Sequence, residues 1–122
     1  IENAKKNVLE NSQKNNLSEL TFLCSDVGKF ILNNPEYQNK IHTLIIDPPR
    51  AGIAPKTLRK VIRLKAKVII YVSCNPATQA RDLITLHEMG YELQKFTLVD
   101  QFPHTSHIES IMLFKKSLIE TI

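Results

Sequence analysis

The sequence contains no tryptophan, only three glycines and only two cysteines among its 122 residues. Cys24 and Cys74 form no CxxC pair and have no Cys/His cluster beside them, so they do not have the ligand spacing of a zinc site. We expect free thiols in a reducing compartment, and therefore a cytoplasmic protein, with one disulfide between the two cysteines as the alternative. No apolar run is long enough to cross a bilayer, so the sequence predicts no membrane partner.

Neither the charge nor the composition of the chain is extreme. Hydrophobic residues make up 43% of the chain and charged residues 23%, as in ordinary globular proteins, and the length suits one domain with a real core. The formal net charge is +4 and the pI is about 9.1. This balance is compatible with RNA as a partner but indicates it only weakly, because many domains without an anionic partner are equally basic.

Segments with strand and helix patterns alternate along the chain, and the last two strands are too close together for a crossover helix. This order predicts an α/β fold with a mostly parallel sheet, helices on both faces and an antiparallel C-terminal strand pair. The expected helices cover 1–13, 27–32, 55–64 and 77–87, and the expected strands cover 20–24, 42–46, 91–102, 107–115 and the run from 68 to Asn75-Pro76.

The most informative stretch is the apolar, β-branched run that begins at Val68 and ends at Asn75-Pro76. It predicts a strand buried on both faces and followed by a helix, with Cys74 at the junction. The carboxyl ends of strands are where ligands bind in open α/β sheets, and a helix N-terminus favours the nucleophilic thiolate. Cys74 is therefore a candidate nucleophile, and a buried structural cysteine is the alternative.

Two further polar clusters fall at the ends of expected strands. Asp47 directly follows a buried strand, and the prolines after it fix the backbone, which is typical of a rigidly held carboxylate or of a simple turn. The second cluster contains His104, His107 and Glu109 at a strand junction. A glutamate inside an apolar strand is costly unless it is paired or functional, whereas the two histidines lack the further ligands of a metal site.

Three motifs follow one another in the chain: Asp47-Pro48-Pro49-Arg50-Ala51-Gly52, the run from Tyr71 to Asp82 that contains Ser73-Cys74-Asn75-Pro76, and the run from Phe102 to Ser110. Together they resemble the S-adenosylmethionine-dependent RNA uracil-C5 methyltransferases, and most of all the enzymes that methylate a uridine of 23S rRNA. Related tRNA enzymes tend to carry a tyrosine where His104 stands and to lack the Ala80-Arg81-Asp82 run.

The resemblance implies a role for each candidate residue. Cys74 is the nucleophile that adds to C6 of uracil, and Glu109 is the base that removes the C5 proton. Asp47 and, through a shorter motif, Asp26 are the implied cofactor contacts. The implied contacts to RNA or to a flipped-out base are Arg50, Arg81, His104 and His107, with hydrogen bonds that fix the strand junction as the alternative for the two histidines.

The resemblance covers nearly the whole chain, and the helical pattern at Ile1 begins without a cap. We therefore expect residues 1–122 to be the C-terminal portion of a catalytic domain, a partial Rossmann-like class I methyltransferase sheet with its first strands missing. The glycine-rich cofactor loop, an RNA-binding barrel and, in some members, an iron–sulfur cluster belong to the missing region. We expect the chain alone to bind S-adenosylmethionine poorly, to be inactive and to dimerise through exposed sheet edges.

Two other functions fit parts of the sequence. An amino-group N-methyltransferase also has a polar-Pro-Pro motif, but it usually has an aromatic residue at the position of Arg50 and does not need Cys74 or Glu109. A non-catalytic RNA-binding remnant is the other alternative, although the chain lacks the interleaved aromatic and basic residues of a dedicated binding module.

Overall fold

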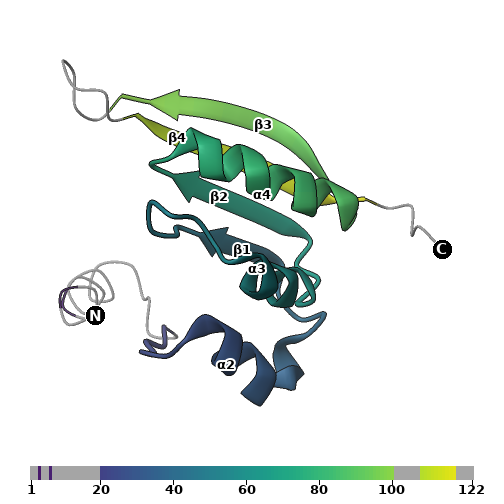
Figure 1. Cartoon of the computed structure of the whole chain (residues 1–122). Helices are drawn as coiled ribbons and strands as arrows, with labels where there is room; N and C mark the ends of the chain where they lie inside the picture. The colour runs from purple at the N-terminus through teal and green to yellow at the C-terminus, as the bar shows by residue number, and fades with distance from the viewer. Residues whose placement is uncertain (1–2, 4–5, 7–19, 101–107, 118–122) are drawn as a thin grey trace.

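A computed structural model of the chain describes residues 3, 6, 20–100 and 108–117, which form a four-stranded sheet with helices packed against it (Figure 1). The strand order is β1-β2-β4-β3, in which β1, β2 and β3 point the same way and β4 runs opposite to them. The strands are β1 Thr43–Ile46, β2 Val68–Ser73, β3 Tyr91–Val99 and β4 Glu109–Lys116; the helices are α2 Val27–Asn33, the 3₁₀-helix η1 Pro35–Tyr37, α3 Pro55–Ile62 and α4 Pro76–Glu88.

The predicted alternation of strand and helix is confirmed from β1 onward, and the last two strands are antiparallel as expected. However, β4 inserts between β2 and β3, so only the β1–β2 ladder is parallel among the three ladders of the described sheet. The carboxyl ends of β1, β2 and β3 still lie at one edge of the sheet, together with the start of β4 (Figure 1). This edge carries the candidate site.

The strand expected over 20–24 is wrong, because these residues have no regular secondary structure. A strand is stable only when its backbone N–H and C=O groups pair with a neighbouring strand, and in the described part of the chain the sheet ends at β1 without pairing to this segment. Its side chains are accordingly open to solvent, with Leu20 51% and Leu23 60% exposed. The helix expected over 1–13 lies outside the described residues, apart from two isolated positions.

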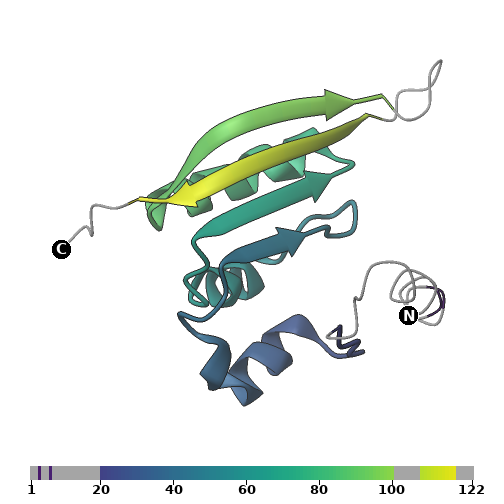
Figure 2. The ribbon, with the colours of Figure 1, turned by 180° about the vertical axis from the view of Figure 1, so that it is seen from behind.

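Helices on both faces of the sheet were expected, but α3 and α4 cover the same face (Figure 1). No helix of the described part of the chain covers the opposite face, which Figure 2 shows from behind. The crossovers from β1 to β2 and from β2 to β3 both move in the same direction across the sheet. Because such crossovers are right-handed, both helices lie on one face.

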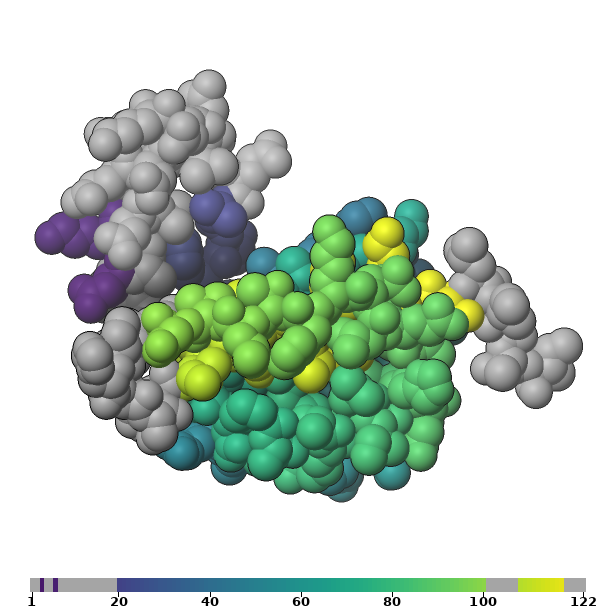
Figure 3. All heavy atoms as spheres, turned by 90° about the horizontal axis from the view of Figure 1, so that it is seen from above, coloured from purple at the N-terminus to yellow at the C-terminus, as the bar shows by residue number. Residues whose placement is uncertain are grey.

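The core lies between this face and the two helices. Side chains of β2 alternate, so that Ile69, Tyr71 and Ser73 are buried, whereas their neighbours on the opposite face are only half-buried. Seen from the β3 edge, α4 lies on one side of the sheet only (Figure 3). Helix α3 contributes Leu58, which is 0% exposed, and burial of one such side chain stabilises the fold by about 1.5–3 kcal/mol.

Two buried tyrosines make the stability of this core sensitive to alkaline pH. Tyr71 and Tyr91 are 0% and 1% exposed, and burial raises the pKa of both phenols; a hydrogen bond to Asp82 raises that of Tyr71 further. The unfolded chain releases these protons near pH 10, whereas the folded chain retains them to higher pH. We therefore expect the free energy of unfolding to fall above about pH 10, by up to about 1.4 kcal/mol per pH unit for each tyrosine.

Urea denaturation at several alkaline pH values measures this slope. Tyr71→Phe and Tyr91→Phe should each reduce it, and Tyr37→Phe, which replaces a tyrosine that is 43% exposed, is the matched control. A slope that is equal in all four proteins would contradict the prediction.

Candidate active site

Cys74 and Glu109 both lie at the carboxyl edge of the sheet, where the β2–β4 ladder ends. Cys74 directly follows β2, and Glu109 is the first residue of the antiparallel neighbour β4. Ser73 pairs with Ser110, so Cys74 and Glu109 occupy the next position along the two chains. Cys74 lies in a bend just outside β2, and Glu109 pairs with Val99 of β3. The thiol and the carboxylate predicted from the sequence thus lie at the same end of the β2–β4 ladder, with Cys74 exposed and Glu109 half-buried.

Asp47 reaches the same edge from β1. It directly follows Ile46, which pairs with Tyr71 of the parallel strand β2. After the two prolines the chain turns back, and the N–H of Gly52 donates to the carbonyl of Pro49 at 2.8 Å. The Asp47 side chain is exposed at a rigid loop beside the end of the strand that carries Cys74.

The loop after β1 is tied to the loop that contains Cys74. The carbonyl of Arg50 accepts hydrogen bonds from Asn75 Nδ2 at 3.1 Å and from Thr78 Oγ1 at 3.4 Å. The backbone of Arg50 therefore has a structural role, whereas its side chain remains exposed. Contact of this guanidinium with RNA stays a prediction.

The residues on either side of Cys74 are held by local hydrogen bonds. Ser73 Oγ accepts from the N–H of Asn75 at 2.9 Å and lies 3.0 Å from the Asn75 carbonyl, to which it donates. Asn75 Oδ1 accepts from the N–H of Ala77 at 3.2 Å and thereby caps α4, whose first residue is Pro76. Cys74 therefore presents a free, exposed thiol from a fixed backbone at the start of a helix.

Behind this edge lies a buried polar cluster that sequence reasoning missed. Gln79 of α4 is 0% exposed, and its Nε2 donates to the carbonyls of Tyr71 at 3.1 Å and Ser110 at 3.4 Å; Ser110 Oγ donates to Gln79 Oε1. Gln79 thus joins β2 to β4 beside the position of Cys74 and Glu109. The sequence does indicate this burial, because Gln79, Asp82 and Leu86 are spaced so that they lie on one side of α4. That side faces the core, so the two polar residues are buried with Leu86.

Arg81 and Asp82 extend this cluster. Asp82, 2% exposed, accepts from Tyr71 Oη at 2.6 Å and from Arg81 Nε at 3.2 Å. Arg81 Nη2 also donates to the carbonyl of Ile53 at 3.2 Å. A Cβ at Gly52, where φ is +80°, would lie 2.8 Å from this nitrogen, so the turn requires glycine. Arg81 therefore fixes the loop after β1, and its predicted contact with RNA is untested.

Asp26 lies at the start of α2, on the same side of the molecule as the carboxyl ends of the strands (Figure 1). Its Oδ1 accepts from the N–H of Lys29 at 3.0 Å, so it is a helix cap. Its predicted cofactor contact stays a prediction. His104 and His107 lie outside the described residues.

Within the part of the chain that the structure describes, no three His, Cys, Asp or Glu residues are placed to hold a metal ion. The described helices include none with the length and apolar character needed to span a membrane.

Comparison with solved structures gives the class of fold. M1.HpyAVI is similar to this chain with a TM-score of 0.62, over 78% of this chain and 54% of that one, at 15% sequence identity. The Pyrococcus abyssi tRNA (uracil-54, C5)-methyltransferase, solved in complex with S-adenosyl-L-homocysteine, has a TM-score of 0.52 and is 43% identical, over 60% of this chain and 18% of that one. The described sheet is the α/β sheet of a methyltransferase.

The chain belongs to the tRNA (uracil-5-)-methyltransferase family, whose model matches residues 2–117. An uncharacterized RNA methyltransferase of Clostridium acetobutylicum is 42% identical over 98% of this chain. The 23S rRNA (uracil(1939)-C(5))-methyltransferase RlmD of Klebsiella pneumoniae is 39% identical over 89% of this chain. The chain spans 25% of the length of each of these two relatives. The resemblance read from the three motifs is thus confirmed.

Proposed function

We propose that this chain is the catalytic C-terminal portion of a cytoplasmic RNA methyltransferase that methylates C5 of a uridine in 23S rRNA. The observation that carries the proposal is the position of Cys74 and Glu109 at the carboxyl edge of the sheet, each one residue beyond the Ser73–Ser110 pair that ends the antiparallel β2–β4 ladder. Membership of the uracil-5 methyltransferase family and similarity to a 23S rRNA enzyme support the reaction and the RNA.

This placement suits a reaction in two stages at one pyrimidine. The Cys74 thiolate adds to C6, which moves the C5=C6 electron pair to C5 and makes that carbon a nucleophile able to accept a methyl group. Glu109 then takes the proton from C5, the C5=C6 bond forms again and the Cys74 thiolate leaves. A thiol and a base on neighbouring strands can serve adjacent carbons of one ring, provided that the uridine leaves its stack.

S-adenosylmethionine would supply the methyl group. The exposed carboxylates of Asp47 and Asp26 are hydrogen-bond acceptors, and the amino and hydroxyl groups of this cofactor are donors, so the two aspartates suit its binding. We assign them to the cofactor, and Arg50, Arg81, His104 and His107 to the RNA.

The test uses the full-length protein with S-adenosylmethionine and a 23S rRNA transcript that carries 5-fluorouridine. Fluorine cannot leave C5 as a proton does, so the reaction should stop at a covalent protein–RNA adduct. Denaturing mass spectrometry should map this adduct to Cys74 and find none in Cys74→Ala, whereas Cys24→Ala, which also removes an exposed free thiol, should still form it. Methylated RNA without any adduct would indicate N-methylation instead, and binding without methyl transfer would indicate a non-catalytic RNA-binding protein.

A further inference from the structure

The positive charge of the chain is concentrated in one short segment. Residues 54–67 contain six lysines and arginines and no acidic residue, whereas the other 108 residues contain ten basic and twelve acidic residues. The whole positive excess of the chain therefore comes from this segment, which comprises helix α3 and the turn after it.

The basic residues of α3 form a stripe along its outer face, which we call the α3 stripe. Its members are Lys56, Arg59, Lys60 and Arg63, spaced at i, i+3, i+4 and i+7, so they lie on one side of the helix. The opposite side holds the buried residues Leu58, Val61 and Ile62. Lys56, Arg59 and Arg63 are exposed, Lys60 is half-buried, and the exposed Lys65 and Lys67 continue the positive charge beyond the helix.

Within the described residues these cations have no acidic partner, since the one ion pair there joins Arg81 to Asp82. Like charges at i, i+3 and i, i+4 destabilise a helix by a few tenths of a kcal/mol for each pair. Arg59 and Lys60 lie in the last turn of α3, where the helix dipole favours cations and offsets this repulsion. The exposed cations of the stripe are available for an external anion.

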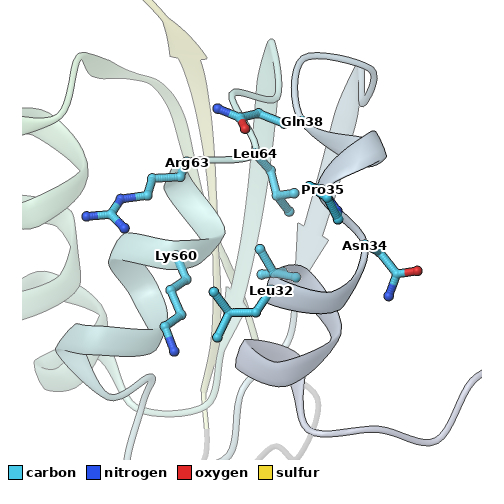
Figure 4. Close-up of a pocket in the computed structure, with 8 residues that line it drawn as sticks. Leu32, Asn34, Pro35, Gln38, Lys60, Arg63 and Leu64 are labelled. Atoms are coloured by element: carbon cyan, nitrogen blue, oxygen red, sulfur yellow. The ribbon is translucent and has the colours of Figure 1, made fainter.

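The pocket beside the stripe does not neutralise it. Between α2 and α3 lies a cavity of about 190 Å³, lined by Leu32 and Leu64 among others, with Lys60 and Arg63 at its rim. Figure 4 shows that the charged ends of Lys60 and Arg63 point away from these leucines. Arg63 therefore faces the surroundings, whereas the half-buried Lys60 lies against α2, where a Cβ at Gly28 would be 3.6 Å from Lys60 Nζ and 3.4 Å from Asp26 Oδ1.

The stripe follows the loop after β1, which comes from the candidate active site. Helix α3 begins two residues after Ile53, whose carbonyl is held by Arg81 in the loop that follows Asp47. From Lys56 to Arg63 the helix rises by about 10 Å, the length occupied by about three phosphates of one strand of a duplex. The loop that carries Asp47 thus leads along the chain into the stripe.

We propose that the α3 stripe binds the sugar–phosphate backbone of the substrate RNA outside the target uridine. The inference rests on the proposed function for the identity of the RNA. The stripe supplies affinity and orientation without reading the base sequence, because phosphate contacts are the same for every nucleotide.

The test measures binding of the full-length protein to fluorescent oligouridylate by anisotropy, between about 50 and 200 mM salt. The variant Arg59→Gln/Arg63→Gln removes two charges of the stripe and keeps long, helix-forming side chains. The matched control, Lys95→Gln/Lys115→Gln, removes the same charge from exposed positions on β3 and β4. We expect binding roughly tenfold weaker in the stripe variant, a salt slope lower by about 1 to 2, and a change of less than about twofold in the control.

Equal losses in the two variants, or a stripe variant that binds like the wild type, would overturn the inference. The inference would also be overturned if the stripe were needed for binding to polyglutamate or to phosphatidylglycerol vesicles but not to RNA. The stripe would then suit an acidic protein or a membrane. Methylation of 23S rRNA is followed in the same preparations. If the wild type methylates the RNA and both variants bind RNA normally, only the role of the stripe is refuted. If binding depends on the stripe but no methyluridine forms, only the proposed reaction is refuted.

Discussion

Glu109→Gln in the full-length protein is expected to accumulate a covalent complex with ordinary, unfluorinated uridine RNA. Glutamine keeps the size of the side chain but cannot accept the C5 proton, so the adduct forms at Cys74 and is not resolved. Turnover should fall by about 10²–10⁴-fold, while a band of protein linked to RNA appears on a denaturing gel. A merely structural role for Glu109 would lower both adduct and product.

Two variants make this result specific. Glu92→Gln changes an exposed glutamate on β3 and should leave turnover and the gel unchanged. Cys74→Ala/Glu109→Gln should show no linked RNA, because the thiol that forms the bond is gone. Turnover of Glu109→Gln close to that of the wild type would exclude Glu109 as the base.

Asp82→Ala is expected to lower the free energy of unfolding by about 3 kcal/mol. The change leaves the buried Tyr71 hydroxyl without its acceptor, which costs about 1–3 kcal/mol, and it adds a void and frees Arg81. Asp82→Asn should cost less, because it retains an acceptor oxygen for Tyr71. Urea denaturation measures both losses, and Asp100→Ala, at an exposed position, is the matched control. Equal stability of Asp82→Ala and wild type would show that the cluster contributes nothing to folding.

Much of the site could be predicted from the sequence because it lies where strands end. Apolar runs followed by Asp47 and by Cys74 mark the carboxyl ends of two parallel strands, and such ends share an edge. The position of Glu109 relative to Cys74 depends on β4 pairing with β2, and the apolar pattern of β4 is equally compatible with a strand at the outer edge. The motif resemblance identified Glu109 as a candidate base. The register between β4 and β2 was needed to place Glu109 at the same end of the ladder as Cys74.

Other features depend on long-range contacts that local patterns do not record. Residues 20–24 have the composition of a strand, but a strand forms only with a partner, and this segment pairs with no strand of the described sheet. The roles of Gln79 and Asp82 required knowing which side of α4 faces the sheet, since a polar residue in a helix is usually exposed. The hydrogen bond from Arg81 to the carbonyl of Ile53 could not be predicted, because the two residues are 28 positions apart in sequence.

The hydrogen bonds from Asn75 and Thr78 to the carbonyl of Arg50 join two loops that come from different strands. One loop carries Asp47, assigned to the cofactor, and the other carries Cys74, assigned to the uridine. A shift of either loop must therefore displace the other or break both bonds. Under the proposed assignments, the spacing between methyl donor and nucleophile would depend on these shared hydrogen bonds and not on two loops that move independently.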